Sequence, residues 1–223
     1  MAMTTYFFDT NFLFRVFFNK NYLYISDLKD YLNNDSAKFI SGNVEYEFSN
    51  IFLVFLNQLN HFLIAPYYEL EGSGGDMTLE DYMRLTESIE VLKFNNKGIS
   101  EMIWKCVCGD KKSISKKDFR KGLKRFIFDF NHYFHFKYND LMGQITIHRR
   151  LEDYHDISMV LGHVLHRSDL KICLDAHDVA VKNGIDDLVF VTGDRSFLEN
   201  AELILEYTEI DTIMQFKHSK KSK

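Results

Sequence analysis

The chain has 223 residues, of which 46% are hydrophobic and 26% charged, so a full core can form and disorder is not expected. Its net charge of −5 gives no whole-chain argument for nucleic-acid binding. Three cysteines exclude a disulfide framework and favour a reducing, cytoplasmic location. No apolar run reaches about 18 residues, so we expect no membrane span.

The first predicted strand is the short apolar run at residues 5–8, and Asp9-Thr10-Asn11 follows it directly. Residues 12–18 are rich in Phe, Leu and Val, which predicts a buried helix on the sheet. A second helix is predicted at 22–31, followed by a turn at 33–35.

A second strand is predicted at residues 38–40, after which Ser41 or Asn43 can cap a helix. Glu47 lies one to two turns inside this helix. The helix continues through residue 56 as a nearly all-apolar segment, and Pro66 is expected to end or kink it.

The middle of the chain predicts a mostly helical insertion at about 66–145. Residues 71–76 form the clearest loop, and helices are predicted at 78–94 and 115–136. A further helix is predicted at 151–166, on the far side of the insertion.

The stretch from Asp169 to Phe197 organises the chain. Its first part has apolar residues at helical spacing, and Asn183-Gly184 is a helix-stop signal. Residues 188–191 are a continuous apolar run typical of a strand buried in a parallel sheet. Asp194 follows that strand, where open α/β sheets place their ligand crevice, and Asp175 projects from the preceding helix.

These motifs resemble those of the PIN-domain nucleases. The matching segments are D-T-N at 9–11, S-x-x-V-x-x-E-F at 41–48, D-A-x-x-x-A at 175–180 and T-x-D at 192–194. The resemblance covers about the first and last 55 residues. It implies a three-layer α/β/α fold with a central, mostly parallel sheet, within one PIN-like domain that carries the helical insertion.

By this resemblance, four acidic side chains would hold Mg²⁺ or Mn²⁺: Asp9, Glu47, Asp175 and Asp194. Hard divalent ions prefer oxygen ligands, lower the pKa of bound water and clamp phosphate oxygens. The implied function is cleavage of single-stranded RNA by metal-activated water. A protein inhibitor or antitoxin, and a homodimer, are further partners that the family would suggest.

Four other residues are secondary candidates. Asp169 precedes Asp175 by a spacing also found in the related NYN nucleases, and Asp178 lies one helical turn after Asp175. For these two, a helix cap and a solvated charge are the favoured alternatives. Asn11 and Thr192 could orient ligands or water, or form local turn hydrogen bonds.

A basic stretch at residues 111–125 could grip an RNA backbone. Its candidate contacts are Lys116, Lys117, Lys121 and Lys124. A solvated helix face explains these lysines equally well. The histidine and cysteine pairs do not match usual zinc spacings, so a zinc site is not expected.

Two other functions remain open. Many PIN relatives have an acidic residue two places after the position of Asp194, where this chain has Ser196. That departure favours a PIN-like scaffold that binds RNA or a protein without cleaving. A haloacid-dehalogenase-like phosphatase is disfavoured, because Asn11 stands where that family has its general acid.

Overall fold

The computed structural model describes residues 4–17, 35–89 and 96–215. The helix predicted at 22–31 therefore lies outside the described residues. The chain divides into two compact units: Met1–Asn50 with Tyr138–Lys223, and Ile51–Lys137. The insertion was predicted at about 66–145, whereas the second unit begins at Ile51, inside a long helix, and ends at Lys137.

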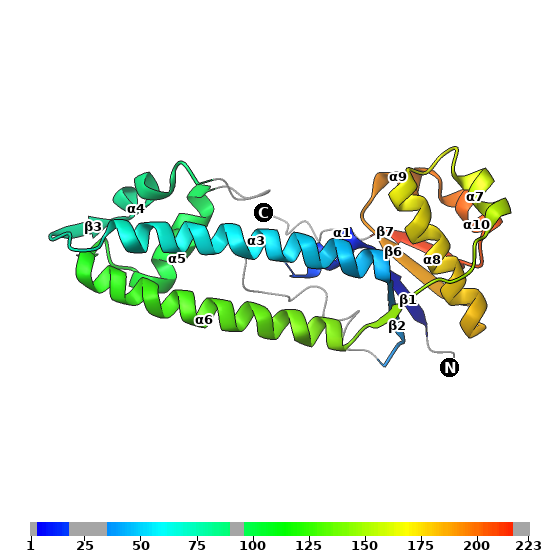
Figure 1. The fold of residues 1–223 in the computed structure, drawn as a ribbon, viewed down its shortest axis with the longest axis horizontal. Coiled ribbons are helices and arrows are strands. Elements are labelled where there is room, and N and C mark those ends of the chain that lie inside the picture. Colours follow the sequence, from blue (N-terminus) through cyan, green and yellow to red (C-terminus); the bar gives the residue numbers. More distant parts are fainter. Residues whose placement is uncertain (1–3, 18–34, 90–95, 216–223) are drawn as a thin grey trace. The chain divides into compact units, whose positions relative to one another are not determined.

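The first unit is built on a parallel sheet with the strand order β5-β2-β1-β6-β7 (Figure 1). Its strands are β1 (Thr5–Phe8), β2 (Lys38–Ser41), β5 (Thr146–His148), β6 (Leu188–Thr192) and β7 (Thr212–Gln215). Helices lie on the sheet in an α/β/α arrangement, with α8 packed on β2 and α1 on β6. The predicted fold class, α/β with a parallel central sheet, is confirmed.

The centre of the sheet is formed by β1 and β6, which pair in register with Phe8 opposite Val191. All of β6 is buried, as the continuous apolar run predicted. The Phe190 ring lies 5.6 Å from Phe7 and 4.9 Å from Phe197, between ring centroids. This aromatic packing fixes the carboxyl ends of both strands at one edge.

The helices of the described residues belonging wholly to the first unit are α1 (Thr10–Phe17), α7 (His155–Leu161), α8 (Arg167–Asn183), α9 (Arg195–Glu199) and α10 (Ala201–Tyr207). The α8 helix ends at Gly184, whose left-handed φ of 60° is the conformation that glycine adopts without strain. The predicted stop signal is therefore confirmed.

The prediction of one helix at 151–166 was wrong in extent. The chain is irregular up to Tyr154, and α7 covers only His155–Leu161 before α8 begins. Strands β5 and β7 were not predicted at all. They are three and four residues long and mostly exposed or half-buried, so they carry no apolar run.

The second unit is mostly helical. It contains part of α3 (Gly42–Glu69), α4 (Leu79–Thr86), α5 (Asn96–Cys108) and most of α6 (Lys116–Gly143). It also has a small antiparallel sheet of β3 (Asp76–Thr78) and β4 (Ser113–Ser115), which is separate from the central sheet. Each of these strands has one apolar residue between two polar ones, Met77 or Ile114, which is too short a pattern to predict a strand.

Each strand of this small sheet leads directly into a capped helix. The Thr78 side chain accepts from the Asp81 N–H, and the Asp81 carboxylate accepts from the Thr78 N–H at 3.0 Å. Ser115 likewise accepts from the Asp118 N–H at 3.1 Å. Such caps satisfy backbone donors that the first helical turn leaves open.

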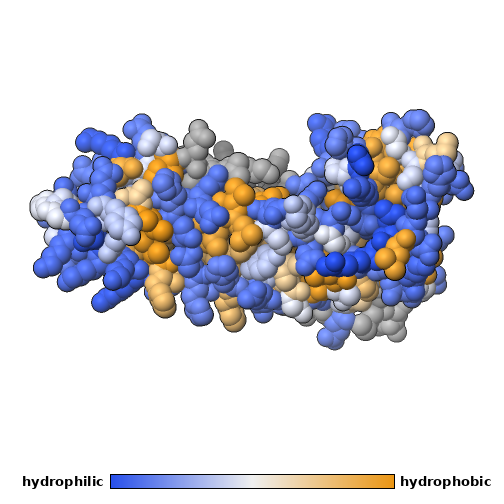
Figure 2. Space-filling model, viewed as in Figure 1, coloured by the Kyte–Doolittle hydropathy of each residue, from blue (hydrophilic) through white to orange (hydrophobic). Residues whose placement is uncertain are grey.

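The α3 helix continues through Pro66 and ends at Glu69, so the proline lies in the last turn instead of ending the helix at once. By length and composition α3 could cross a membrane, a test that core helices of soluble proteins also pass. In Figure 2, apolar side chains stand among hydrophilic ones along the helices of the second unit. Leu53 and Phe128 are among those exposed.

A buried hydroxyl in the second unit gives a stability prediction. Tyr82 is fully buried, packs against Phe62 and Phe119, and its hydroxyl has no hydrogen-bond partner among the described residues. We expect Tyr82→Phe to stabilise the protein by about 1 kcal/mol, because an unsatisfied polar group is removed. Denaturant unfolding measures the change.

Tyr154→Phe is the matched control, because the Tyr154 hydroxyl donates to Asp178 at 2.5 Å. Its removal should lower stability by about 1 kcal/mol or more, since it leaves a buried carboxylate oxygen without its donor. A loss of stability in Tyr82→Phe would show that the Tyr82 hydroxyl does have a partner.

Candidate functional site

Asp9 follows β1 directly, and hydrogen bonds hold both its backbone and its carboxylate. Its N–H donates to the Val191 carbonyl at 3.3 Å, and the Phe12 N–H donates to its Oδ1 at 2.6 Å. The Thr192 hydroxyl donates to its Oδ2. The carboxylate therefore caps the first turn of α1, and Asp9 is only 2% exposed.

The pKa of Asp9 is raised from the ordinary 3.8 to about 6, mainly because burial disfavours the charged form. The negative charge of Asp194 raises this pKa further. The hydrogen bonds from Thr192 and Phe12 act in the opposite direction and do not cancel the effect of burial. The neighbours of Asp9 therefore do not fully compensate the burial of its ionised form.

Asp194 lies after β6 and caps the short helix α9, accepting from the Ser196 N–H at 2.9 Å. Its own N–H donates to the Thr192 hydroxyl at 3.0 Å, the same hydroxyl that donates to Asp9. The Asn11 amide lies 3.4 Å from its Oδ2. Asn11 and Thr192, both secondary candidates, thus connect Asp9-Thr10-Asn11 with Asp194.

Glu47 and Asp169 reach the same sheet edge from two helices. Glu47 of α3 accepts from the Thr10 hydroxyl at 2.7 Å, next to Asp9 in the chain. Asp169 lies in the first turn of α8 and accepts from the Ser196 hydroxyl at 2.8 Å. Ser196 therefore joins Asp169 to the segment that carries Asp194.

These carboxylates share a lack of positive partners. None of the four, Asp9, Glu47, Asp169 and Asp194, forms an ion pair with a residue in the described ranges. Within those ranges, no three His, Cys, Asp or Glu side chains are arranged closely enough to hold a metal ion. The edge is thus a chain of hydrogen-bonded carboxylates with uncompensated charge.

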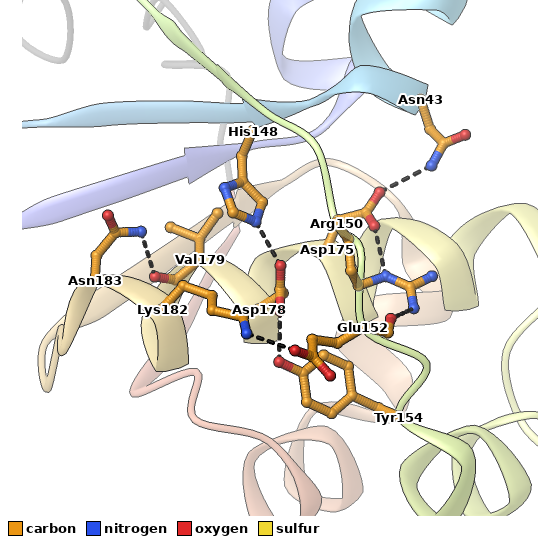
Figure 3. Close-up of polar contacts among 10 residues, drawn as sticks. All are labelled: Asn43, His148, Arg150, Glu152, Tyr154, Asp175, Asp178, Val179, Lys182 and Asn183. Atoms are coloured by element: carbon orange, nitrogen blue, oxygen red, sulfur yellow. Dashed lines mark hydrogen bonds and ion pairs between the residues drawn. The ribbon is translucent and has the colours of Figure 1, made fainter.

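Asp175, by contrast, is compensated. Arg150 donates from Nε to its Oδ1 at 2.9 Å, and Asn43 donates to its Oδ2 at 2.9 Å (Figure 3). The side chain of Asp175 is 4% exposed and that of Arg150 is 17% exposed, so the ion pair is largely shielded from water. The fourth residue of the predicted set is therefore already occupied by a cation and an amide.

Asp178 also has both oxygens occupied. His148 Nε2 lies 2.6 Å from Oδ2, and the Tyr154 hydroxyl donates to Oδ1 (Figure 3). Burial opposes ionisation of Asp178, but the hydrogen bonds from Tyr154 and His148 lower its pKa below the ordinary value. These contacts favour a structural role for Asp178. The favoured alternative, a solvated charge, was wrong, because Asp178 is buried.

Three partners were missed by sequence reasoning: His148, Arg150 and Tyr154. They come from β5 and the irregular chain after it, which pass alongside α8. The run His148-Arg149-Arg150 was visible as basic residues, but only recognition of the short edge strand β5 would have placed it at the carboxyl end of the sheet.

The four predicted RNA-binding lysines lie on α6, in the second unit. Lys117, Lys121 and Lys124 are exposed at spacings that share one helix face, while Lys116 is half-buried.

Comparison of the chain with protein-family models, curated proteins and solved structures found no match. The geometry described above is therefore the basis for assigning a function.

The burial of Asp9 predicts a pH dependence of stability. A carboxyl whose pKa is higher in the folded than in the unfolded chain stabilises the fold at low pH, and loses that contribution as pH rises through the folded pKa. The pKa moves from 3.8 to about 6. In EDTA, the parent should therefore lose up to about 3 kcal/mol between pH 4 and 7 through this group.

Asp9→Asn should lack this loss, because the amide stays neutral and its oxygen can still accept from the Phe12 N–H. Denaturant unfolding of parent and variant across this pH range gives the difference directly. Parallel stability curves for the two proteins would show that Asp9 ionises normally.

Proposed function

We propose that the protein is a Mg²⁺- or Mn²⁺-dependent ribonuclease with a PIN-like fold that cleaves single-stranded RNA. The observation that carries the proposal is the set of unpaired carboxylates, Asp9, Glu47 and Asp194, at the carboxyl end of β1 and β6. A parallel sheet places ligands at this edge. The order and spacing of the motifs add support.

The donor chemistry of these side chains fits a hard divalent cation. Carboxylate oxygens are its preferred ligands. Burial and the charge of Asp194 raise the pKa of Asp9, and a nearby positive charge would lower the cost of ionising this carboxyl. Asp9, Glu47 and Asp194 would hold the ion, and Asp175 would join them on release of its oxygen by Arg150. When bound, such an ion lowers the pKa of water and stabilises charge on phosphate.

The residues of the chain position these ligands. The Thr192 hydroxyl bonds both the Asp9 carboxylate and the Asp194 N–H, so the two acids keep a fixed relation. Thr10 orients Glu47 at 2.7 Å. Because no three acidic side chains of the described residues are close enough to hold an ion, these carboxylates would have to move together on binding.

The lysines of α6 would contribute to RNA binding, not to the chemistry. Lys117, Lys121 and Lys124 are exposed on one face and pair with no acidic residue in the described ranges. Unpaired cations are available to replace the counterions of a nucleic-acid backbone.

A second candidate function is RNA or protein binding without cleavage. The Arg150–Asp175 ion pair favours it, since one predicted ligand is already neutralised. The two functions are separated by incubating the protein and a labelled single-stranded RNA with Mn²⁺ or with EDTA. Cleavage only with Mn²⁺ supports the nuclease, and intact RNA in both supports the binding protein.

Asp194→Asn tests the metal site. We expect the cleavage rate to fall at least about 100-fold. Substitution of residues that only support metal ligands already lowers metal affinity or activity by about 10- to 100-fold, and a direct ligand should matter more. The variant should be as stable as the parent in EDTA, because a repulsive charge is lost, yet gain less stability from Mn²⁺. Thermal melts with and without Mn²⁺ measure both effects.

Asp156→Asn is the matched control, since Asp156 is exposed on α7 and makes the same charge change outside the site. It should behave like the parent in cleavage and in its Mn²⁺ response. An equal Mn²⁺ shift in Asp194→Asn and the parent would exclude Asp194 as a ligand.

Replacing Lys116, Lys117, Lys121 and Lys124 together by Ala should weaken RNA binding. The slope of log affinity against log salt should flatten by up to about 3, because fewer counterions are released from single-stranded RNA. Fluorescence anisotropy at several salt concentrations measures the slope. Substitution of the same residues by Arg keeps the charge and should keep the slope, whereas an unchanged slope in the Ala variant would identify a solvated helix face.

A further inference from the structure

A pocket of about 540 Å³ opens beside Asp175 within the first unit. Its size is in the usual range for a small-molecule or single-nucleotide site. One wall is the first two turns of α3, from Gly42 to Ser49, and the other is formed by the chain after β5 and by Lys171 of α8. The ion pair of Arg150 with Asp175 lies in its lining (Figure 3).

The positive charge of this pocket exceeds what its own carboxylates neutralise. Arg150 forms an ion pair with Asp175. Arg149 forms only a long ion pair with Glu45, with 3.6 Å between the nitrogen and the oxygen, and 79% of the Arg149 side chain is exposed. Lys171 is exposed and pairs with no acidic residue among those described. Arg149 and Lys171 can therefore bind an anion from outside.

An aromatic ring stands at the same pocket. Tyr46 lines it and is 70% exposed, so its ring is accessible to a ligand. Any nucleic-acid base is planar and can stack on such a ring, so this contact does not depend on the nucleotide sequence. A ring beside two cations suits a ligand that combines a flat heterocycle with a phosphate.

The pocket adjoins the unpaired carboxylates. Asn43, which bonds Asp175, and Glu47, which bonds Thr10, are one helical turn apart on the same face of α3. Four residues correspond to about 6 Å along the helix axis. A chain of nucleotides lying in the pocket could therefore continue onto the sheet edge.

We propose that this pocket binds one nucleotide of a single-stranded RNA, with its base on Tyr46 and its phosphate on Arg149 and Lys171. The choice of RNA as the ligand rests on the proposed function, whereas the stacking and phosphate contacts rest on the pocket itself. A duplex keeps its bases stacked and unavailable, so the pocket selects an unpaired strand.

Binding of a short labelled single-stranded RNA, measured in EDTA so that no cleavage occurs, tests the proposal. Tyr46→Ala should weaken binding about tenfold, as expected for loss of one stacked base, while Tyr46→Phe keeps the affinity. Lys171→Ala should weaken binding and flatten the salt slope by about 0.7. Arg167→Ala removes an exposed charge from the same helix outside the pocket and should change affinity less.

The outcomes separate this site from the nuclease. If Tyr46→Ala and Lys171→Ala both keep the affinity of the parent, the pocket assignment fails, whether or not the parent cleaves RNA with Mn²⁺. If both variants lose affinity and the parent never cleaves, the pocket stands and the nuclease fails. Equal affinity for duplex RNA, or equal competition by polyglutamate, would overturn binding of an unstacked nucleotide.

Discussion

The hydroxyl of Thr192 is the contact on which the candidate site depends. It donates to the Asp9 carboxylate and accepts from the Asp194 N–H, so one side chain links the ends of two strands. This is possible only because β1 and β6 are neighbours with Phe8 opposite Val191. A shift of this register would turn Thr192 toward the other face of the sheet and separate the two acids.

The carboxyl edge of the sheet divides into two electrostatic regions. Around β1 and β6 the acids are hydrogen-bonded but have no counter-charge among the described residues, and the pKa of Asp9 rises accordingly. Around β2 and β5 the acids face Arg150 and His148, which neutralise or orient them. In the proposed function, the first region would receive a divalent cation and the rim of the second would receive a phosphate.

Much of the central sheet followed from the sequence, because β1 and β6 are buried runs with an acidic residue one or two places after each. Burial on both faces produces a pattern that needs no knowledge of the neighbours. The partners of Asp175 and Asp178 could not be obtained in this way. They depend on β5, whose residues are mostly exposed, and on pairing over sequence separations of 25 and 30 residues.

The small sheet of the second unit joins two successive helix–strand–helix segments, α3–β3–α4 and α5–β4–α6. The last residue of each strand, Thr78 or Ser115, also caps the helix that follows it. Pairing of the two strands places Thr78 opposite Ser113 and Asp76 opposite Ser115. The first turns of α4 and α6 are therefore held beside one another by the same residues that form the sheet. A substitution that breaks one cap would also loosen the pairing that positions the other helix.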